Sequence, residues 1–120
     1  MDTARAVLEK GRYLYVGFMC HQTVEKALKA VWQQVLGTVP PKTHSLLYLL
    51  EKCGLSLQLP EHLSELVDEL EPLNIQARYP EYREALARQL RAESCARILS
   101  QTTEIFTWIK TRPSPAQSST

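Results

Sequence analysis

Three charged residues in one short stretch are the first that could do chemistry. Glu25, Lys26 and Lys29 lie within one and a half turns of a predicted helix, and Glu25 and Lys29 have the i,i+4 spacing of an ion pair. Such a pair contributes only about 0.3–0.5 kcal/mol when it is exposed. These residues therefore form either a solvated helix face or, with Gln22, a wall of a groove that binds phosphate.

A second polar segment, Lys42-Thr43-His44, follows Pro40-Pro41. We expect Thr43 to cap the next helix, which would place His44 beside the exposed N–H groups and partial positive charge of a helix N-terminus. Two interpretations stay open: an ordinary capping turn, or a corner that binds an anion.

Two further sites have a functional and a structural interpretation. Arg78 and Tyr79 precede Pro80, and an arginine can bind phosphate with two N–H groups while a tyrosine can stack on a base. Alternatively, Arg78 pairs with an internal carboxylate such as Glu25, and Tyr79 packs against the bend. His21 has apolar neighbours, so we expect a hydrogen-bonded residue of the core or of a dimer seam rather than a ligand.

Several kinds of site are excluded by spacing. Cys20, Cys53 and Cys95 are far apart and form no CxxC motif, so we expect buried free thiols in a reducing compartment. The three histidines and three cysteines lack the spacing of metal ligands, and neither a glycine-rich phosphate loop nor a GxSxG motif occurs. We therefore predict no bound metal and no cofactor.

The composition indicates one globular domain. Of the 120 residues, 44% are hydrophobic and 22% are charged, and the net charge is +1. This balance argues against disorder, and it gives no overall reason to expect binding to nucleic acid or to an anionic membrane. The apolar stretches are shorter than the roughly 18 residues that suggest a spanning helix, and no secretion signal is visible at the start. We therefore expect a cytoplasmic protein that does not enter the membrane.

The elements that must position these residues are helices, because the chain has four glycines and little strict alternation of apolar and polar residues. The pattern predicts a first helix from about Thr3 to Lys10, ended by Gly11, and a second from about Tyr13 to Leu36, ended by Gly37. The second helix carries two adjoining apolar stripes, so we expect it to be central and contacted on several sides. The stripes are Leu14, Phe18, His21, Leu28 and Trp32, and Cys20, Val24, Ala27, Val31 and Val35.

Three more helices are predicted beyond Pro40-Pro41. The third ends at Gly54, the fourth begins near Pro60, and the fifth begins between Glu84 and Ala92 and runs to about Lys110. Pro72 must kink or end the fourth helix, because proline lacks an N–H group and crowds the preceding turn. The residues expected to face inward are Leu46, Leu47, Leu49, Leu50 and Cys53, then Leu63, Leu66, Val67 and Leu70, and finally Cys95, Ile98, Thr102, Ile105 and Ile109. Those expected to face outward on the fourth helix are Glu61, Glu65, Asp68, Glu69 and Glu71.

The predicted fold class is therefore all-α, an up-and-down bundle of about five helices with a long central second helix. This domain is expected to occupy residues 1–111, and the Pro/Ser-rich tail, 112–120, is expected to be disordered. The apolar stripes and the aromatic residues are more than a bundle of this size covers easily, so we also predict a two-fold homodimer.

The order of these signals resembles the HEPN domain family, small helical bundles named for nucleotide binding. The resemblance spans Asp2 to about Lys110 and rests on GRY at 11–13, CHQTVEKALKAVW at 20–32, PKTHSLLYLLE at 41–51 and ARYP at 77–80. It implies a homodimer or a partnership with a small nucleotidyltransferase, and action around nucleotides or RNA in stress responses or toxin–antitoxin pairs. It favours a ligand groove lined by Gln22, Glu25, Lys26, Lys29, Lys42, His44, Arg78 and Tyr79.

The sequence also departs from the family pattern. Ribonuclease members carry an arginine followed after four to six residues by a histidine, late in the fold, whereas the histidines here are at 21, 44 and 62, and none follows an arginine at that spacing. A Tyr-Ile pair that family members often show corresponds here to Asn74-Ile75. We therefore predict no catalytic residue and a non-catalytic module associated with nucleotides or RNA. The alternatives are a homodimeric scaffold with a vestigial groove and a divergent HEPN ribonuclease or toxin.

Overall fold

A computed structural model describes residues 2–76 and 92–111 of the chain, with the backbone alone described at 2–14, 74–76 and 92. These residues form four helices and no strand: α1 (Asp2–Leu36), α2 (Leu46–Lys52), α3 (Glu61–Gln76) and α5 (Ala92–Thr111). The all-α class is confirmed. The expected tail and the residues Arg78 and Tyr79 lie outside the described residues.

The first two predicted helices are one continuous helix, α1, so the expected count of about five is too high by one in this part of the chain. Gly11 does not end the helix, because a glycine within a helix costs only about 1 kcal/mol relative to alanine and the residues on both sides are helical. Gly37 does end it. Its φ of 69° is left-handed, and its N–H group donates to the carbonyl of Gln33 at 3.0 Å.

The N-cap of helix α2 lies two residues later than predicted, at Ser45 instead of Thr43. Ser45 is the N-cap, and its side chain accepts from the backbone N–H of Tyr48 at 3.2 Å. Thr43, the expected cap, accepts instead from the N–H of Ser45 at 3.1 Å and so stabilises the turn before the helix. Gly54, with φ 74°, follows the helix as predicted.

Helix α3 continues past Pro72 to Gln76, so of the two predicted effects of this proline, a kink or a helix end, the helix end is wrong. Proline removes the N–H group that would have bonded to the carbonyl of Asp68. Because Asp68 and Pro72 are both exposed, water can solvate that carbonyl, and the buried face of the helix is unaffected. The expected start is nearly right, since the carbonyl of Pro60 accepts from the N–H groups of Leu63 and Ser64.

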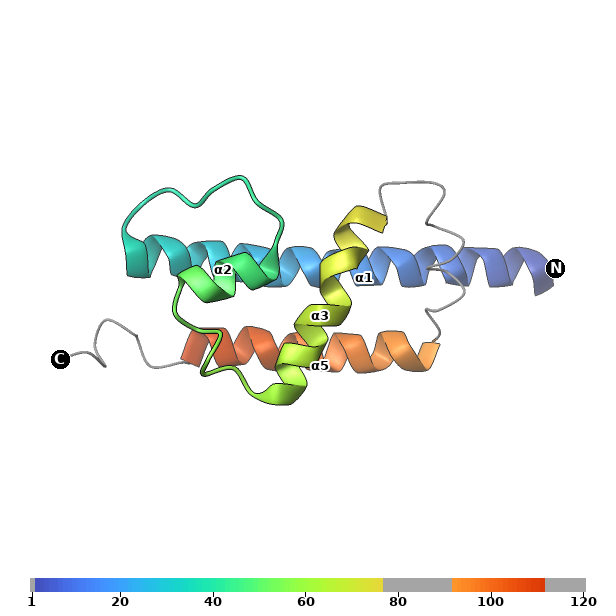
Figure 1. Cartoon of the computed structure of the whole chain (residues 1–120). Helices are drawn as coiled ribbons and strands as arrows, with labels where there is room; N and C mark the ends of the chain where they lie inside the picture. The colour runs from blue at the N-terminus through green and yellow to red at the C-terminus, as the bar shows by residue number, and fades with distance from the viewer. Residues whose placement is uncertain (1, 77–91, 112–120) are drawn as a thin grey trace.

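The other three helices, α2, α3 and α5, pack around α1, which is central as predicted. Figure 1 shows α1 and α5 side by side and running in the same direction, while α3 crosses both steeply. This differs from the simple up-and-down order that we expected, because α3 lies across the junction of α1 and α5 instead of alongside one of them. Arg97 of α5 holds the crossing helix through both guanidinium NH2 groups, each 2.7 Å from an oxygen of Glu69.

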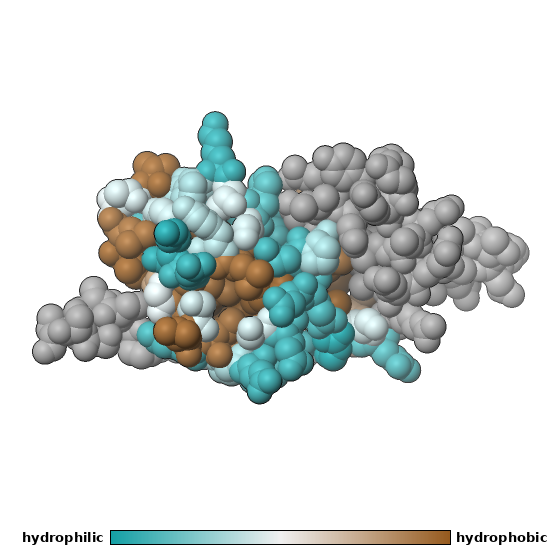
Figure 2. Space-filling model, in the orientation of Figure 1, coloured by the Kyte–Doolittle hydropathy of each residue, from teal (hydrophilic) through white to brown (hydrophobic). Residues whose placement is uncertain are grey.

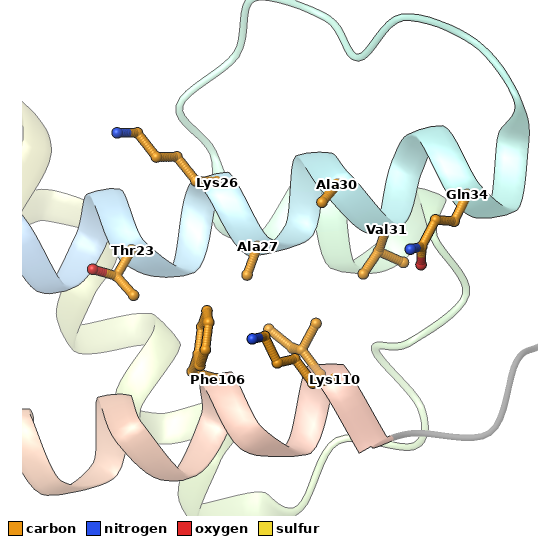
Figure 3. Close-up of a pocket in the computed structure, with 9 residues that line it drawn as sticks. Thr23, Lys26, Ala27, Ala30, Val31, Gln34, Phe106 and Lys110 are labelled. Carbon is orange, nitrogen blue, oxygen red and sulfur yellow. The ribbon is translucent and has the colours of Figure 1, made fainter.

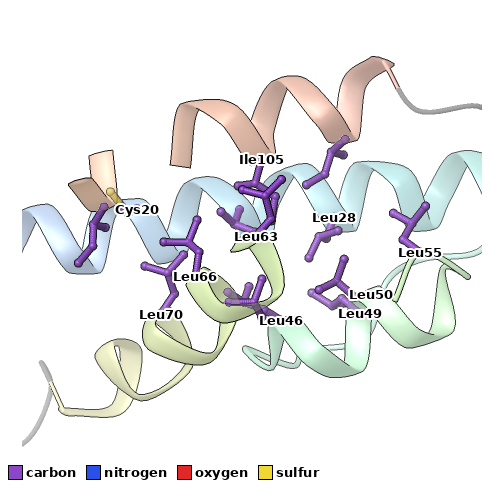
Figure 4. Close-up of a cluster of buried hydrophobic side chains, with 14 of the residues drawn as sticks. Cys20, Leu28, Leu46, Leu49, Leu50, Leu55, Leu63, Leu66, Leu70 and Ile105 are labelled. Atoms are coloured by element: carbon purple, nitrogen blue, oxygen red, sulfur yellow. The ribbon is translucent and has the colours of Figure 1, made fainter. Parts of the chain in front are cut away.

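The core lies where α1, α2, α3 and α5 converge (Figure 4). The five residues of the predicted seam on α5 are all buried, and so are the four predicted inward residues of α3. Leu47 is an exception, because it was expected to face inward and is 46% exposed. Figure 2 shows hydrophilic surface over α3, in agreement with the exposed Glu61, Glu65, Asp68 and Glu69. Within the described residues, no helix has the length and hydrophobicity needed to cross a bilayer.

Candidate functional site

Glu25 on α1 is the centre of a polar cluster. Its side chain is only 6% exposed, and its two carboxylate oxygens bind different partners. Oε2 accepts from Nζ of Lys29 at 3.1 Å, one turn further along α1, and Oε1 lies 3.0 Å from Nδ1 of His44. The sequence spacing predicted the first contact. The second joins α1 to the segment before α2, across 19 positions of the chain.

These partners decide the charge state of Glu25. Burial alone would raise the pKa of the Glu25 carboxyl, but the hydrogen bonds from His44 and Lys29 and the charge of Lys29 outweigh burial, so the pKa lies below its ordinary value. The carboxylate is therefore ionised at neutral pH, and an ionised carboxylate only accepts hydrogen bonds. Nδ1 of His44 must then carry the proton in this contact.

His21 lies beside Glu25 in the interior. Its side chain is 0% exposed, and its Nδ1 is 3.7 Å from Oε1 of Glu25, which is beyond hydrogen-bonding distance. Burial lowers the pKa of His21, and the nearby carboxylates of Glu25 and Glu71 only partly oppose this, so the ring is neutral at pH 7. The predicted core position is confirmed. Neither ring nitrogen has a partner of ordinary hydrogen-bond geometry among the described residues, and a polar contact with the backbone of His44 also opposes the lowering of the His21 pKa.

Glu71 of α3 positions the segment that carries His44, although we expected it to face outward. Its carboxylate accepts from the hydroxyl of Ser45 at 3.1 Å and from the backbone N–H of Leu46. A carboxylate at this place complements the partial positive charge of a helix N-terminus. The donors expected to bind an external anion beside His44 are thus partly used by Glu71. We call His21, Glu25, Lys29, His44 and Glu71 the Glu25 cluster.

The other predicted ligand residues lie around this cluster or outside the described residues. Gln22 is half-buried, one turn before Lys26, and both Lys26 and Lys42 are exposed. With about 100° per residue, Lys26 lies about 60° around α1 from Lys29, further from His44 and closer to α5. The structure therefore brings Glu25, Lys29 and His44 into direct contact and leaves Lys26 and Lys42 at the surface.

The cluster can bind an anion or exchange a proton at its outer edge. The side chain of His44 is 46% exposed, and nothing among the described residues bonds to its Nε2. Lys29, 24% exposed, keeps N–H donors beyond the one that it gives to Glu25. No group of three His, Cys, Asp or Glu side chains in the described part of the chain is arranged to hold a metal ion.

Comparison with known proteins places these features in a family. Neither the curated proteins nor the solved structures include a match to this chain. The family model for the HEPN domain matches residues 1–112, which include every residue of the Glu25 cluster. The chain belongs to the HEPN domain family.

Proposed function

We propose that this protein is a non-catalytic HEPN module that binds a nucleotide or RNA at the Glu25 cluster and works with a small nucleotidyltransferase partner. The contact between Glu25 and His44 is the main support, because it joins two of the four sequence segments on which the family resemblance rests. Family membership supports an association with nucleotides or RNA in general terms.

The charges around the cluster suit a phosphate group. The carboxylate of Glu25 is buried and neutralised by its own partners, whereas Lys29 is partly exposed and Lys26 and Lys42 are exposed. Lys29 and His44 reach the outer edge, where their N–H groups would meet phosphate oxygens, while the carboxylates of Glu25 and Glu71 bind internal partners. Arg78 and Tyr79 remain proposed contributors, as a phosphate ligand and a stacking surface.

A thermal-shift titration with ATP, GTP and single-stranded RNA tests this proposal. A ligand that binds only the native state stabilises it by about 2.7 kcal/mol at 100 times its dissociation constant. Lys42→Gln should weaken binding by roughly two- to fivefold, the effect of one exposed charge, and Lys52→Gln on α2 should leave it unchanged. Wild-type protein whose midpoint does not move with any of the three ligands would refute the proposal.

A divergent ribonuclease is the second candidate, and one observation favours it. Because Nδ1 of His44 donates to the ionised Glu25, a neutral His44 presents the lone pair of Nε2 at a half-exposed surface, where it can accept a proton. The non-catalytic proposal predicts that purified protein leaves single-stranded and structured RNA intact. Cleavage that persists through purification and disappears in His44→Asn would establish the ribonuclease instead.

The proposed homodimer and the scaffold alternative need a separate measurement. Light scattering coupled to size exclusion should give a mass near twice 13.7 kDa at low micromolar concentration. A dimer that binds none of the nucleotide or RNA probes is the outcome expected of a scaffold with a vestigial groove. A constant monomer mass over a dilution series would exclude the homodimer.

A further inference from the structure

A second surface feature lies on the face of α1 turned away from α2 and α3. Two cavities, of about 500 and about 400 Å³, lie between α1 and α5, and they adjoin at Thr23 and Phe106, which line both; we call the two together the α1–α5 groove. Figure 3 shows Phe106 of α5 pointing toward α1, opposite Ala27, with α2 and α3 behind. From α1 the lining residues also include Val16, Cys20, Ala30, Val31 and Gln34.

The groove is mainly apolar, and two of its threonine hydroxyls bond within their own helices. Thr23 donates to the carbonyl of Met19 at 2.9 Å, and Thr103 donates to the carbonyl of Leu99 at 3.1 Å. Both threonines therefore offer mainly their methyl groups to the groove. Tyr15, Met19 and Leu99 line one end and are 65%, 44% and 48% exposed. Large apolar side chains exposed together on one face commonly mark an interaction surface.

The charges beside the groove have one sign. Lys26 extends from the α1 rim, and Lys110 of α5 lies with its ammonium 4.5 Å from the centre of the Phe106 ring. Among the described residues, neither cavity includes an aspartate or a glutamate in its lining. A complementary occupant therefore carries apolar side chains at its centre and carboxylates on both flanks.

The shape of the groove favours a helix from a different protein over a second copy of this chain. A two-fold contact would place one concave groove against another and bring Lys26 and Lys110 of each copy to the same interface, where like charges repel. A single helix is convex and fills such a depression, with apolar residues at i, i+3, i+4 and i+7. From Tyr15 to Gln34 the groove is about 28 Å long at 1.5 Å per residue, which accommodates about five helical turns.

We propose that the α1–α5 groove binds an amphipathic α-helix of a partner protein, with the apolar face of that helix in the groove and acidic residues beside Lys26 and Lys110. The floor of the groove holds this helix through apolar contacts, because the Thr102 hydroxyl is buried beside the Cys20 thiol, interacts with that thiol and does not reach the surface.

Selection from a displayed library of helical peptides tests this proposal without a known partner. Peptides of about 18 residues carry apolar anchors at the spacing above and random Glu, Gln or Lys at the flanking positions. Selection on the wild-type protein should enrich glutamate on both flanks. The selected peptides should bind Ala30→Phe at least about tenfold more weakly, because the exposed Ala30 lines the groove and a bulkier side chain fills it.

Two charge variants complete the experiment. Lys110→Glu should weaken the selected peptides by about two- to fivefold, whereas Lys52→Glu, on the opposite side of α1, should not. Circular dichroism shows whether each variant folds. If Ala30→Phe does not fold, the weaker peptide binding expected of Lys110→Glu tests the groove by itself. Enrichment without an acidic bias, no enrichment, or equal binding to the groove variants would overturn the proposal. Conversion of a wild-type dimer to a monomer by Ala30→Phe would also overturn it and assign the groove to a second copy.

Discussion

The Glu25 cluster and the α1–α5 groove lie on different sides of the same helix. Their polar groups differ in where their hydrogen-bond partners lie. In the cluster, a buried carboxylate is paired with side chains from another part of α1 and from the segment before α2. In the groove, the hydroxyl groups of Thr23 and Thr103 are satisfied by their own helices, and apolar surface is left exposed.

The polar groups of the cluster are paired mainly within the chain, whereas the apolar surface of the groove would be covered only by another molecule. Both oxygens of the Glu25 carboxylate are paired inside the cluster, so its structure depends on internal contacts. Exposed apolar side chains contribute hydrophobic free energy only when another surface removes them from water. We therefore expect substitutions of the buried residues of the cluster, and of the core beneath it, to lower stability, and substitutions in the groove to weaken partner binding with little effect on stability.

The largest expected effect compares two leucines. Leu28 of α1 is 0% exposed and Leu99 of the groove is 48% exposed. Leu28→Ala should lower the free energy of unfolding by about 2–5 kcal/mol, because it removes buried contacts and leaves a cavity, whereas Leu99→Ala should lower it by less than about 1 kcal/mol. Urea denaturation measures both. Similar losses in the two variants would show that the groove is part of the core.

A smaller effect is expected when Glu25 loses both partners. The double variant Lys29→Ala/His44→Ala leaves a carboxylate that is only 6% exposed without its two hydrogen-bond donors. We expect a loss of about 2–3 kcal/mol in the free energy of unfolding, below the 3–5 kcal/mol of a fully buried pair because Lys29 and His44 are both partly exposed. Adding Glu25→Gln to the double variant should restore part of the loss. An unchanged midpoint in the double variant would mean that water solvates Glu25 adequately.

The cluster should also make stability depend on pH. The pKa of His21 is lowered in the folded protein, so below the ordinary value near 6.5 the unfolded chain binds more protons and stability falls as pH decreases. His21→Met should remove this part of the dependence, which for one group has a slope of at most about 1.4 kcal/mol per pH unit. Denaturation at pH 7, 6 and 5 measures it. Parallel curves for the two proteins would show that His21 does not titrate differently on unfolding.

The pKa of Glu25 is lowered as well, so its contribution is present above the ordinary carboxyl value near 4.3 and is lost as pH falls through the lower folded value. Glu25→Gln should therefore flatten the acid side of the stability curve below about pH 4.3, with a slope change of at most about 1.4 kcal/mol per pH unit.

The smallest effect on stability is expected for the groove variants. Ala30→Phe and Lys110→Glu change exposed side chains, so each should alter the free energy of unfolding by no more than about 0.5 kcal/mol. The same two variants are expected to weaken peptide binding, and that contrast distinguishes a docking surface from a structural one. A large loss of stability in Ala30→Phe would place this position in the core.

Much of the fold was predictable because it depends on local periodicity. The buried seam on α5 follows from the spacing of Cys95, Ile98 and Thr102 and their successors, and Gly37 and Gly54 mark helix ends as expected. Periodicity does not report direction in space, so it gave no sign that α3 crosses α1 and α5. Gly11 misled the prediction, because glycine permits a helix end without requiring one.

Only those contacts of the candidate site that lie within one helix were predictable from the sequence. The spacing of Glu25 and Lys29 on one helix determines their contact, but the contact with His44 depends on where the chain returns after Pro41. Glu71 was missed because it belongs to an acidic helix. A signal was present, since Glu71 follows the buried Val67 by four residues and thus borders the apolar stripe, whereas Glu65 and Asp68 lie further from it.

The pairing of α1 with α5 has a consequence for how the protein is made. Residues such as Val31 and Ile109 lie on the two helices that contact each other but are far apart in the sequence. During synthesis, the apolar side of α1 therefore leaves the ribosome long before the helix that covers it. Such delayed long-range contacts slow folding and expose surface that chaperones recognise. Nascent chains halted before α5 should consequently be protease-sensitive and bound by chaperones, and release of the chaperone should follow the emergence of α5.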